Sequence, residues 1–208
     1  MDRQFDEKYI DKELESIGIR IKKPTGIYLI GGCAMSLRQL KESTKDIDIV
    51  FRNKEDYEAF ADALFGAQYY EPFTITSEYL HLEAMKMYEN KDAFHLDLFV
   101  GQVLRKLVLS DSMIKRAEMY KKHGNMEVYL LSKEDVFLFK GFASEGRKRD
   151  LADMNVLYPG LDWVALKQEL KIQKMPKRLM ALFVSRLEEF SRTYKLDVPI
   201  LRELKKKL

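Results

Sequence analysis

A pair of adjacent glycines followed by an Asp-x-Asp motif constrains this chain more than any other feature. Gly31 and Gly32 come directly after the apolar segment 27–30, and Asp46 and Asp48 begin a second apolar run. Because strand side chains alternate between two faces, both carboxylates project from one side and the intervening isoleucine from the other. The pattern predicts a strand, a glycine turn that opens a helix, and a second strand that returns beside the first.

This combination of residue types suits nucleotide chemistry. A Gly-Gly turn that opens a helix can approach phosphates through backbone N–H groups, because glycine has no side chain and accepts left-handed dihedral angles. Two carboxylates on one face of a strand are suitable ligands for Mg²⁺. An Asp-x-Asp motif alone is common at solvated strand edges, but the apolar residues around Asp46 and Asp48 favour a functional pair here.

A third carboxylate, Asp97, lies in the otherwise apolar segment 93–99. A buried carboxylate is costly unless it is paired or bound to a metal. If this strand neighbours the strand 46–51, three aspartates converge on one site; the alternative is that Asp97 caps a sheet edge or meets a surface lysine. His95 shares the face of Asp97 and is either a base, a substrate contact, or an ordinary surface or cross-strand histidine.

A helical segment further along the chain carries the next candidates. Ser132 and Asp135 have the spacing of a helix N-terminal capping box, and Lys140 falls within the apolar run that follows. Lys140 and Arg147 then share one helical face, with Asp150 on the next turn. That face could hold triphosphate oxygens. Alternatively, Asp150 pairs with a nearby arginine and joins two helices, and the residues leave both interpretations open.

Composition places the chain among ordinary globular proteins. It has 208 residues, of which 46% are hydrophobic and 33% charged, and no apolar run approaches the length of a membrane span. The charged N-terminus is unlike a secretory signal. The single cysteine, Cys33, is consistent with a reducing cytoplasm, and we expect it to be a small buried residue rather than a reactive thiol.

Hydrophobic periodicity predicts a fold of the α+β class, with a mixed sheet, flanking helices and a C-terminal helical lobe. The expected division is an α/β lobe over residues 1–131 and a helical lobe over residues 132–208. The expected strands are 27–30, 46–51, 78–88, 93–99 and a hairpin within 117–131. The expected helices are 5–17, 32–41, 54–66, 133–144, 147–157, 162–173, 177–191 and 199–206.

Charge is distributed unevenly along the chain. Residues 165–208 contain twelve lysines and arginines against five acidic residues, a net charge of +7, so the remainder carries +3 − 7 = −4. A basic helical lobe beside an acidic site could bind nucleic acid phosphates. The alternative is that these cations are only the solvent-facing sides of amphipathic helices.

Together these motifs resemble the nucleotidyltransferase superfamily related to DNA polymerase β. The resemblance is to its small prokaryotic branches, including the AbiEii-type toxins of toxin–antitoxin systems, and it covers residues 27–153, most of the chain. Gly31-Gly32, Asp46 with Asp48, and Asp97 match the superfamily motifs, and Lys140 with the basic segment 147–150 looks like the branch motif. Gly32 departs from many relatives, which have a serine there, and so removes one hydroxyl contact.

The resemblance implies a Mg²⁺-dependent nucleotidyltransferase that moves a nucleoside monophosphate from an NTP to an acceptor and releases pyrophosphate. The implied acceptors are RNA, such as tRNA, a protein or a small molecule, and a cognate antitoxin is an implied partner. Asp46, Asp48 and Asp97 would be catalytic and would bind Mg²⁺ or Mn²⁺. The implied nucleotide contacts are Gly31, Gly32, Ser36, Lys45, Lys140, Arg147 and Asp150.

Two other function classes fit the same sequence, because a fold does not imply an activity. The first is a catalytically inactive module that binds a nucleotide or a nucleic acid, which tight ATP binding without turnover would indicate. The second is a protein whose helical lobe docks a partner, which co-purification of a stoichiometric partner would indicate.

Overall fold

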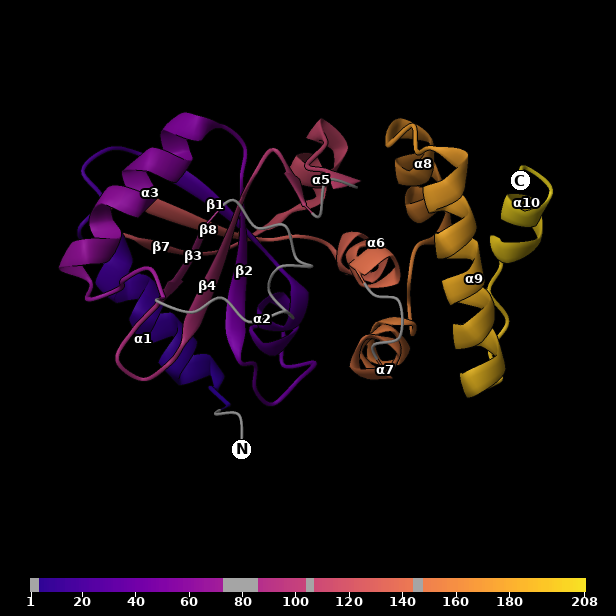
Figure 1. Cartoon of the computed structure of the whole chain (residues 1–208), viewed down its shortest axis with the longest axis horizontal. Helices are drawn as coiled ribbons and strands as arrows, with labels where there is room; N and C mark the ends of the chain where they lie inside the picture. Colours follow the sequence, from indigo (N-terminus) through magenta and orange to yellow (C-terminus); the bar gives the residue numbers. More distant parts are fainter. Residues whose placement is uncertain (1–3, 73–85, 104–106, 144–147) are drawn as a thin grey trace.

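A six-stranded mixed sheet forms the centre of the N-terminal part of the molecule (Figure 1). The computed structural model describes residues 4–72, 86–103, 107–143 and 148–208. In spatial order the sheet is β3-β4-β2-β1-β8-β7. The strand bounds are β1 Thr25–Ile30, β2 Asp46–Phe51, β3 Lys86–Glu89, β4 His95–Val100, β7 Glu118–His123 and β8 Met126–Leu130. Two short strands, β5 Gln102–Val103 and β6 Leu107–Val108, pair separately.

The strand pairing brings both halves of the predicted site to the middle of the sheet. Strand β1 runs antiparallel to β2 and parallel to β8, while β2 runs parallel to β4. Hairpins add β3 to one edge and β7 to the other. The predicted α+β class with a mixed sheet is therefore confirmed, as is the return of the Asp-x-Asp strand beside the first strand.

Helices α1 (Glu7–Gly18) and α3 (Lys54–Gly66) cover one face of this sheet (Figure 1). Local capping fixes where they begin: the side chain of Asp6 accepts from Tyr9 N at 2.9 Å, and that of Asn53 accepts from Asp56 N at 2.8 Å. Phe51 of β2 packs on Phe60 of α3 with ring centroids 5.3 Å apart. The odd-numbered residues of β2 therefore point toward α3, and Asp46 and Asp48 point to the other face.

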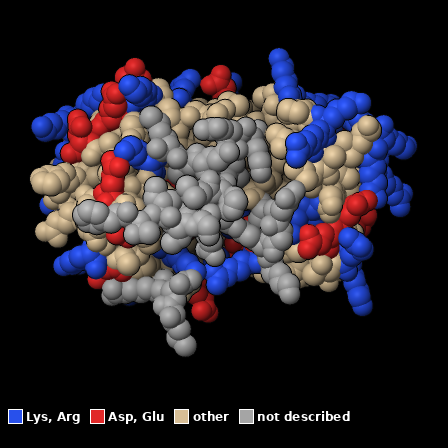
Figure 2. Space-filling view, in the orientation of Figure 1, with Lys and Arg blue, Asp and Glu red and all other residues tan. Residues whose placement is uncertain are grey.

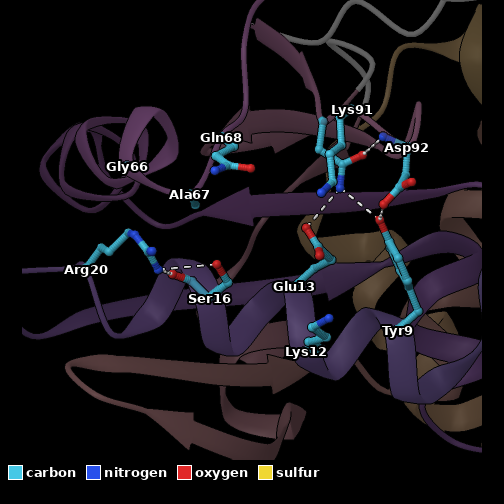
Figure 3. Close-up of a pocket in the computed structure, with 11 residues that line it drawn as sticks. Tyr9, Lys12, Glu13, Ser16, Arg20, Gly66, Ala67, Gln68, Lys91 and Asp92 are labelled. Atoms are coloured by element: carbon cyan, nitrogen blue, oxygen red, sulfur yellow. Dashed lines mark hydrogen bonds between the residues drawn. The ribbon is translucent and has the colours of Figure 1, made fainter.

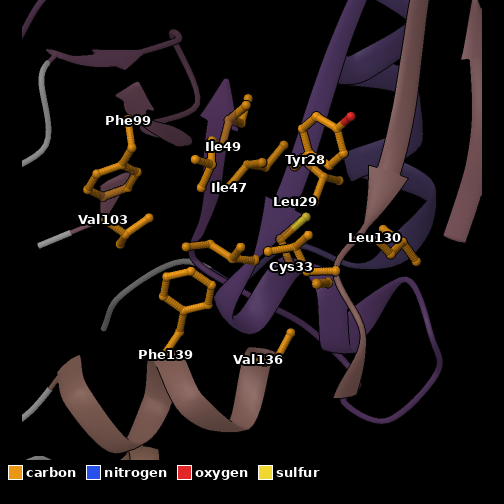
Figure 4. Packing of buried hydrophobic residues seen from close by; sticks show 14 of the residues in the cluster. Tyr28, Leu29, Cys33, Ile47, Ile49, Phe99, Val103, Leu130, Val136 and Phe139 are labelled. Carbon is orange, nitrogen blue, oxygen red and sulfur yellow. The ribbon is translucent and has the colours of Figure 1, made fainter. Parts of the chain in front are cut away.

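The second face is packed against α2 (Gly31–Ser36) and α6 (Lys133–Ala143). Figure 4 shows Phe139 and Val136 of α6 directed toward the strands, close to Phe99 and Cys33. All four of these side chains are buried. Apolar side chains thus close the core on both sides of the sheet.

Beyond the sheet the chain is helical. The remaining helices are α5 Asp111–Arg116, α7 Lys148–Leu157, α8 Trp163–Ile172, α9 Lys177–Tyr194 and α10 Leu201–Lys205. Helix α6 packs on α9 through Phe142 and Phe183, whose rings stack with centroids 4.4 Å apart. A Cβ on Gly141 would lie 2.4 Å from the Phe183 ring, so the close approach of the two helices requires glycine there.

A buried ionic cluster ties α5 to α6 and α8. Arg116 donates to Asp135 at 2.6 Å and to Glu169 at 2.8 Å, and both carboxylates are fully buried. Ser110 and Ser112 also donate to Glu169. Ser132 is the capping residue that the sequence predicts, since its Oγ accepts from Asp135 N at 3.3 Å.

The boundaries of the Asp-x-Asp strand 46–51 and of the helix 54–66 are predicted correctly from the sequence. The helix expected at 32–41 is wrong in length, because α2 ends at Ser36 and Gln39 has a left-handed φ of 59°. The expected strand 78–88 is described only from residue 86 onward, and its earlier part lies outside the described residues. Helix α5 and the pair β5–β6 are not predicted.

Candidate functional site

Two aspartates meet across the central strands of the sheet. Asp48 of β2 and Asp97 of β4 are register partners on parallel strands, and Asp46 is the partner of His95. Register partners project from the same face, so all four side chains lie on the face opposite α1 and α3. Asp97 is fully buried, whereas Asp46 and Asp48 are partly exposed. The prediction that the strand of Asp97 neighbours the strand 46–51 is confirmed.

The turn at Gly31 fits directly against Asp48. Gly31 has a φ of 65°, and a Cβ placed on it would lie 2.1 Å from Asp48 Oδ2. Both the left-handed backbone and the contact exclude any larger residue. The carboxylate of Asp48 is therefore seated against the backbone of the turn that opens α2.

The second glycine faces a different pair of side chains. A Cβ on Gly32 would lie 2.7 Å from Thr44 Oγ1 and 3.7 Å from Lys41 Nζ. Thr44 is buried and its hydroxyl donates to Asp46 O at 3.2 Å, which holds the start of β2. Thr44 and Lys41 are site neighbours that the sequence analysis does not single out, although Thr44 stands only two residues before Asp46.

Cys33 lies beneath the aspartates and is fully buried. Burial, and after it the negative charges of Asp48 and Asp46, raise the pKa of the Cys33 thiol well above its ordinary value. A protonated, enclosed thiol is a poor nucleophile. The prediction that Cys33 is a small buried residue is confirmed.

A chain of ion pairs connects the segment after α2 to α6 and α7. Lys41 Nζ lies 3.1 Å from Asp153, Lys140 Nζ lies 2.7 Å from Asp153, and Lys140 Nζ lies 2.9 Å from Asp150. Burial on its own lowers the pKa of Lys140, but the carboxylates of Asp150 and Asp153 outweigh it and raise the pKa above its usual value. Asp150 thus pairs with a lysine and not with the arginine expected from the sequence.

The other predicted nucleotide contacts are distributed around this centre. Ser36 is the last residue of α2, and its Oγ is buried without a hydrogen-bond partner in the described part of the chain. Lys45 is partly exposed and directly precedes β2. His95 Nδ1 lies 3.7 Å from a carboxylate oxygen of Glu89. Arg147 lies outside the described residues.

Within the described residues, no group of three or more histidine, cysteine, aspartate or glutamate side chains is arranged to hold a metal ion. Mg²⁺ characteristically uses only one or two protein carboxylates, with substrate phosphates and water as its other ligands. The carboxylates of Asp48 and Asp97, on one face of neighbouring strands, form a donor set of that kind.

In comparisons with known proteins, no family model and no curated protein matches this chain. Solved structures do show similarity. The lincosamide antibiotic adenylyltransferase LnuA, with lincomycin bound, is 16% identical with a TM-score of 0.47, covering 76% of this chain and 99% of its own. JHP933 from Helicobacter pylori is 15% identical with a TM-score of 0.43, covering 95% and 92%.

A further Helicobacter pylori protein, proposed to be a nucleotidyltransferase, is 15% identical with a TM-score of 0.47, covering 96% of this chain and 88% of its own. At these identities and TM-scores the similarities assign neither an activity nor a site residue to this chain. None of the helices that the structure describes is long and apolar enough to cross a membrane.

Proposed function

We propose that this protein is a metal-dependent nucleotidyltransferase that transfers a nucleoside monophosphate from an NTP to an acceptor and releases pyrophosphate. The observation that carries the proposal is the in-register pairing of Asp48 with Asp97, beside a glycine turn that leaves room only for the Asp48 carboxylate. A buried carboxylate such as that of Asp97 is costly to maintain, and such a cost is typical of a functional site.

Asp46, Asp48 and Asp97 would hold Mg²⁺ or Mn²⁺ together with the triphosphate. The bound ion would stabilise negative charge on the phosphates during transfer. In the reaction the acceptor oxygen bonds to the α-phosphorus, the bridging α–β P–O bond breaks, and pyrophosphate leaves. The acceptor hydroxyl loses its proton to a base, for which the buried carboxylate of Asp97 is our candidate.

The NTP would lie against the turn formed by Gly31 and Gly32, whose backbone N–H groups would donate to phosphate oxygens. Lys45, Lys140 and Arg147 are the cations that the sequence predicts to bind the triphosphate, and Arg147 lies outside the described residues. In this structure Lys140 is held by Asp150 and Asp153. Lys41 lies closer to Gly32 and keeps one third of its side chain exposed, so we add it as a phosphate-binding candidate.

The acceptor we favour is RNA, such as tRNA. Figure 2 shows lysine and arginine side chains gathered on the right of the view, over α9 and α10. Most acidic residues of this region are already paired: Lys167 with Glu203, Lys205 with Glu188, Lys207 with Glu203 and Arg186 with Glu189. The surplus cations are therefore available to phosphates, and phosphate contacts give salt-dependent affinity.

The test is transfer of label from each NTP, labelled at the α-phosphorus, to total RNA, total protein and small molecules from the host with Mg²⁺ present. The paired control is Asp46→Ala with Asp48→Ala. Label that enters one fraction and disappears in the control supports the proposal and names the acceptor class. Tight, metal-independent NTP binding with no transfer into any fraction would instead indicate the inactive binding module.

A further inference from the structure

A polar hollow lies on the α1–α3 side of the sheet, away from the aspartates (Figure 3). Its volume is about 290 Å³, and it is bounded by α1, the end of α3 and the turn between β3 and β4. Arg20 lies at one end, Tyr9 at the other, and Glu13 between them. Since Phe94 packs on Tyr9 from the sheet face that α1 covers, this hollow is separate from the site of Asp48 and Asp97.

The floor of the hollow is held rigidly by Asn90, which is almost fully buried. Its side-chain oxygen accepts from Asp92 N at 2.9 Å and from Phe94 N at 3.1 Å. Its side-chain nitrogen donates to Tyr9 Oη and to Glu13 Oε2, both at 2.9 Å. A polar floor with this many internal hydrogen bonds is preformed, as small-molecule sites usually are.

Both acidic residues of the hollow already receive hydrogen bonds from tyrosines. Tyr69 donates to Glu13 Oε2 at 2.7 Å, and Tyr9 donates to Asp92 at 3.0 Å. The pKa of Tyr9 is raised to about 12, chiefly by burial. The hydrogen bond from Asn90 lowers this pKa, whereas the negative charges of Glu13 and Asp92 raise it further. The Tyr9 hydroxyl therefore remains protonated and keeps its contact with Asp92 at neutral pH.

The rim carries three cations, Lys12, Arg20 and Lys91, all of them exposed. Within the described residues none of the three pairs with a carboxylate, and Arg20 donates only to Ser16. With Glu13 and Asp92 the lining has a formal charge of +3 − 2 = +1. The positive groups stand at the opening and the hydrogen-bonded acids at the floor.

We propose that this hollow binds a small sugar phosphate. Arginine and lysine at the rim are suited to phosphate oxygens. The carboxylates of Glu13 and Asp92, each with further acceptor capacity, are suited to sugar hydroxyls. The volume is at the lower end of that of small-molecule sites, which favours a ligand the size of a pentose phosphate. The site does not depend on the proposed transferase activity.

The test is a titration of the ¹⁵N-labelled full chain with ribose 5-phosphate, ribose and inorganic phosphate, observed by NMR at the side-chain amides of Asn90 and Gln68. We expect ribose 5-phosphate to shift these signals and to bind more tightly than either fragment. Arg20→Gln with Lys91→Gln should weaken binding at least about tenfold, through loss of two charged contacts. The matched control is Lys23→Gln with Lys115→Gln, two exposed cations outside both the hollow and the helical lobe, which should leave binding unchanged.

Binding should also persist in Asp48→Asn, which separates this hollow from the proposed nucleotide site. No shift at Asn90 or Gln68 with any of the three compounds would overturn the proposal. So would equal affinity for inorganic phosphate and ribose 5-phosphate, since the floor would then contribute nothing. Unchanged binding in the Arg20→Gln and Lys91→Gln variant would also overturn it, and Arg20 and Lys91 are exposed enough that the variant should fold.

Discussion

Gly31 and Asp48 form the tightest junction in the candidate site, because a Cβ on the glycine would lie 2.1 Å from the aspartate Oδ2. The Asp48 carboxylate can therefore occupy its position only because the residue at the turn that opens α2 has no side chain. This junction explains why the glycine pair and the Asp-x-Asp motif occur in one unit, with β1 and β2 as antiparallel neighbours.

Gly31→Ala should destabilise the protein and remove activity together, because the alanine must adopt a left-handed φ and also displace Asp48. Gly101→Ala is the matched control: Gly101 has a similar φ of 69° but nothing within 4 Å of an added Cβ. Left-handed strain of about 1–3 kcal/mol is expected in both variants, with an additional loss only in Gly31→Ala. Urea unfolding measures the difference, and equal losses in the two variants would contradict the Gly31–Asp48 contact.

Lys140→Met should lower the free energy of unfolding by about 3–5 kcal/mol, because it leaves Asp150 and Asp153 with less compensation in a buried setting. Lys140→Arg keeps the charge and should recover part of this loss. The pKa of Lys140 is raised, so its stabilisation is complete below the ordinary value of 10.5 and is lost only as pH rises through the raised pKa. The loss of unfolding free energy in Lys140→Met, measured by urea unfolding, should thus be constant from neutral pH to 10.5. A loss under about 1 kcal/mol would contradict the prediction, because it is the size expected for a solvent-exposed ion pair.

Glu169→Gln should have an effect that depends on pH. Burial alone would raise the pKa of Glu169, but hydrogen bonds from Ser112, Arg116, Gln173 and Ser110 lower it below the ordinary 4.5. The stabilisation is therefore present above 4.5 and is lost as pH falls through the lowered pKa. Urea unfolding should show a loss of about 1–3 kcal/mol at neutral pH, which shrinks in acid. A loss that grows as the pH falls would contradict the assigned direction.

Cys33 should be unreactive toward iodoacetamide in the folded protein and reactive in urea. Its thiol is fully buried and its pKa is raised, first by burial and then by Asp48 and Asp46. Alkylation should be at least about 1000-fold slower than in the unfolded chain, since a stability of about 5 kcal/mol leaves few molecules open. Mass spectrometry follows the reaction, and rapid labelling under native conditions would show that the thiol is accessible.

The local parts of the fold can be predicted from the sequence. The strand 46–51 is recognisable by alternation, and the helix 54–66 by its apolar stripe. The helix predicted to reach residue 41 ends at Ser36, because the chain turns at Gln39 while Leu37 and Leu40 still pack against the core. Apolar spacing that continues through a turn cannot reveal where the helix ends.

Long-range partners account for most of what the sequence does not predict. The sequence predicts that Asp48 and Asp97 converge only if their two strands are neighbours. Whether they are neighbours, and in which register, depends on the whole sheet, because the two strands are distant in sequence. The ion pair between Lys41 and Asp153 joins residues 112 positions apart. The ion pair between Lys140 and Asp150, in contrast, joins two successive helices, α6 and α7, across only 10 positions. The structural alternative for Asp150 could therefore be proposed from spacing.

The central claim is that the carboxylates of Asp48 and Asp97 carry out nucleotidyl transfer, and the most direct measurement compares three single variants. Asp48→Asn and Asp97→Asn should each reduce Mg²⁺-dependent pyrophosphate release from NTP at least about 100-fold, the scale of losing one preorganised charged group. Asp62→Asn, an exposed aspartate of α3, is the matched control and should retain wild-type activity. Wild-type rates in folded Asp48→Asn or Asp97→Asn would contradict the account.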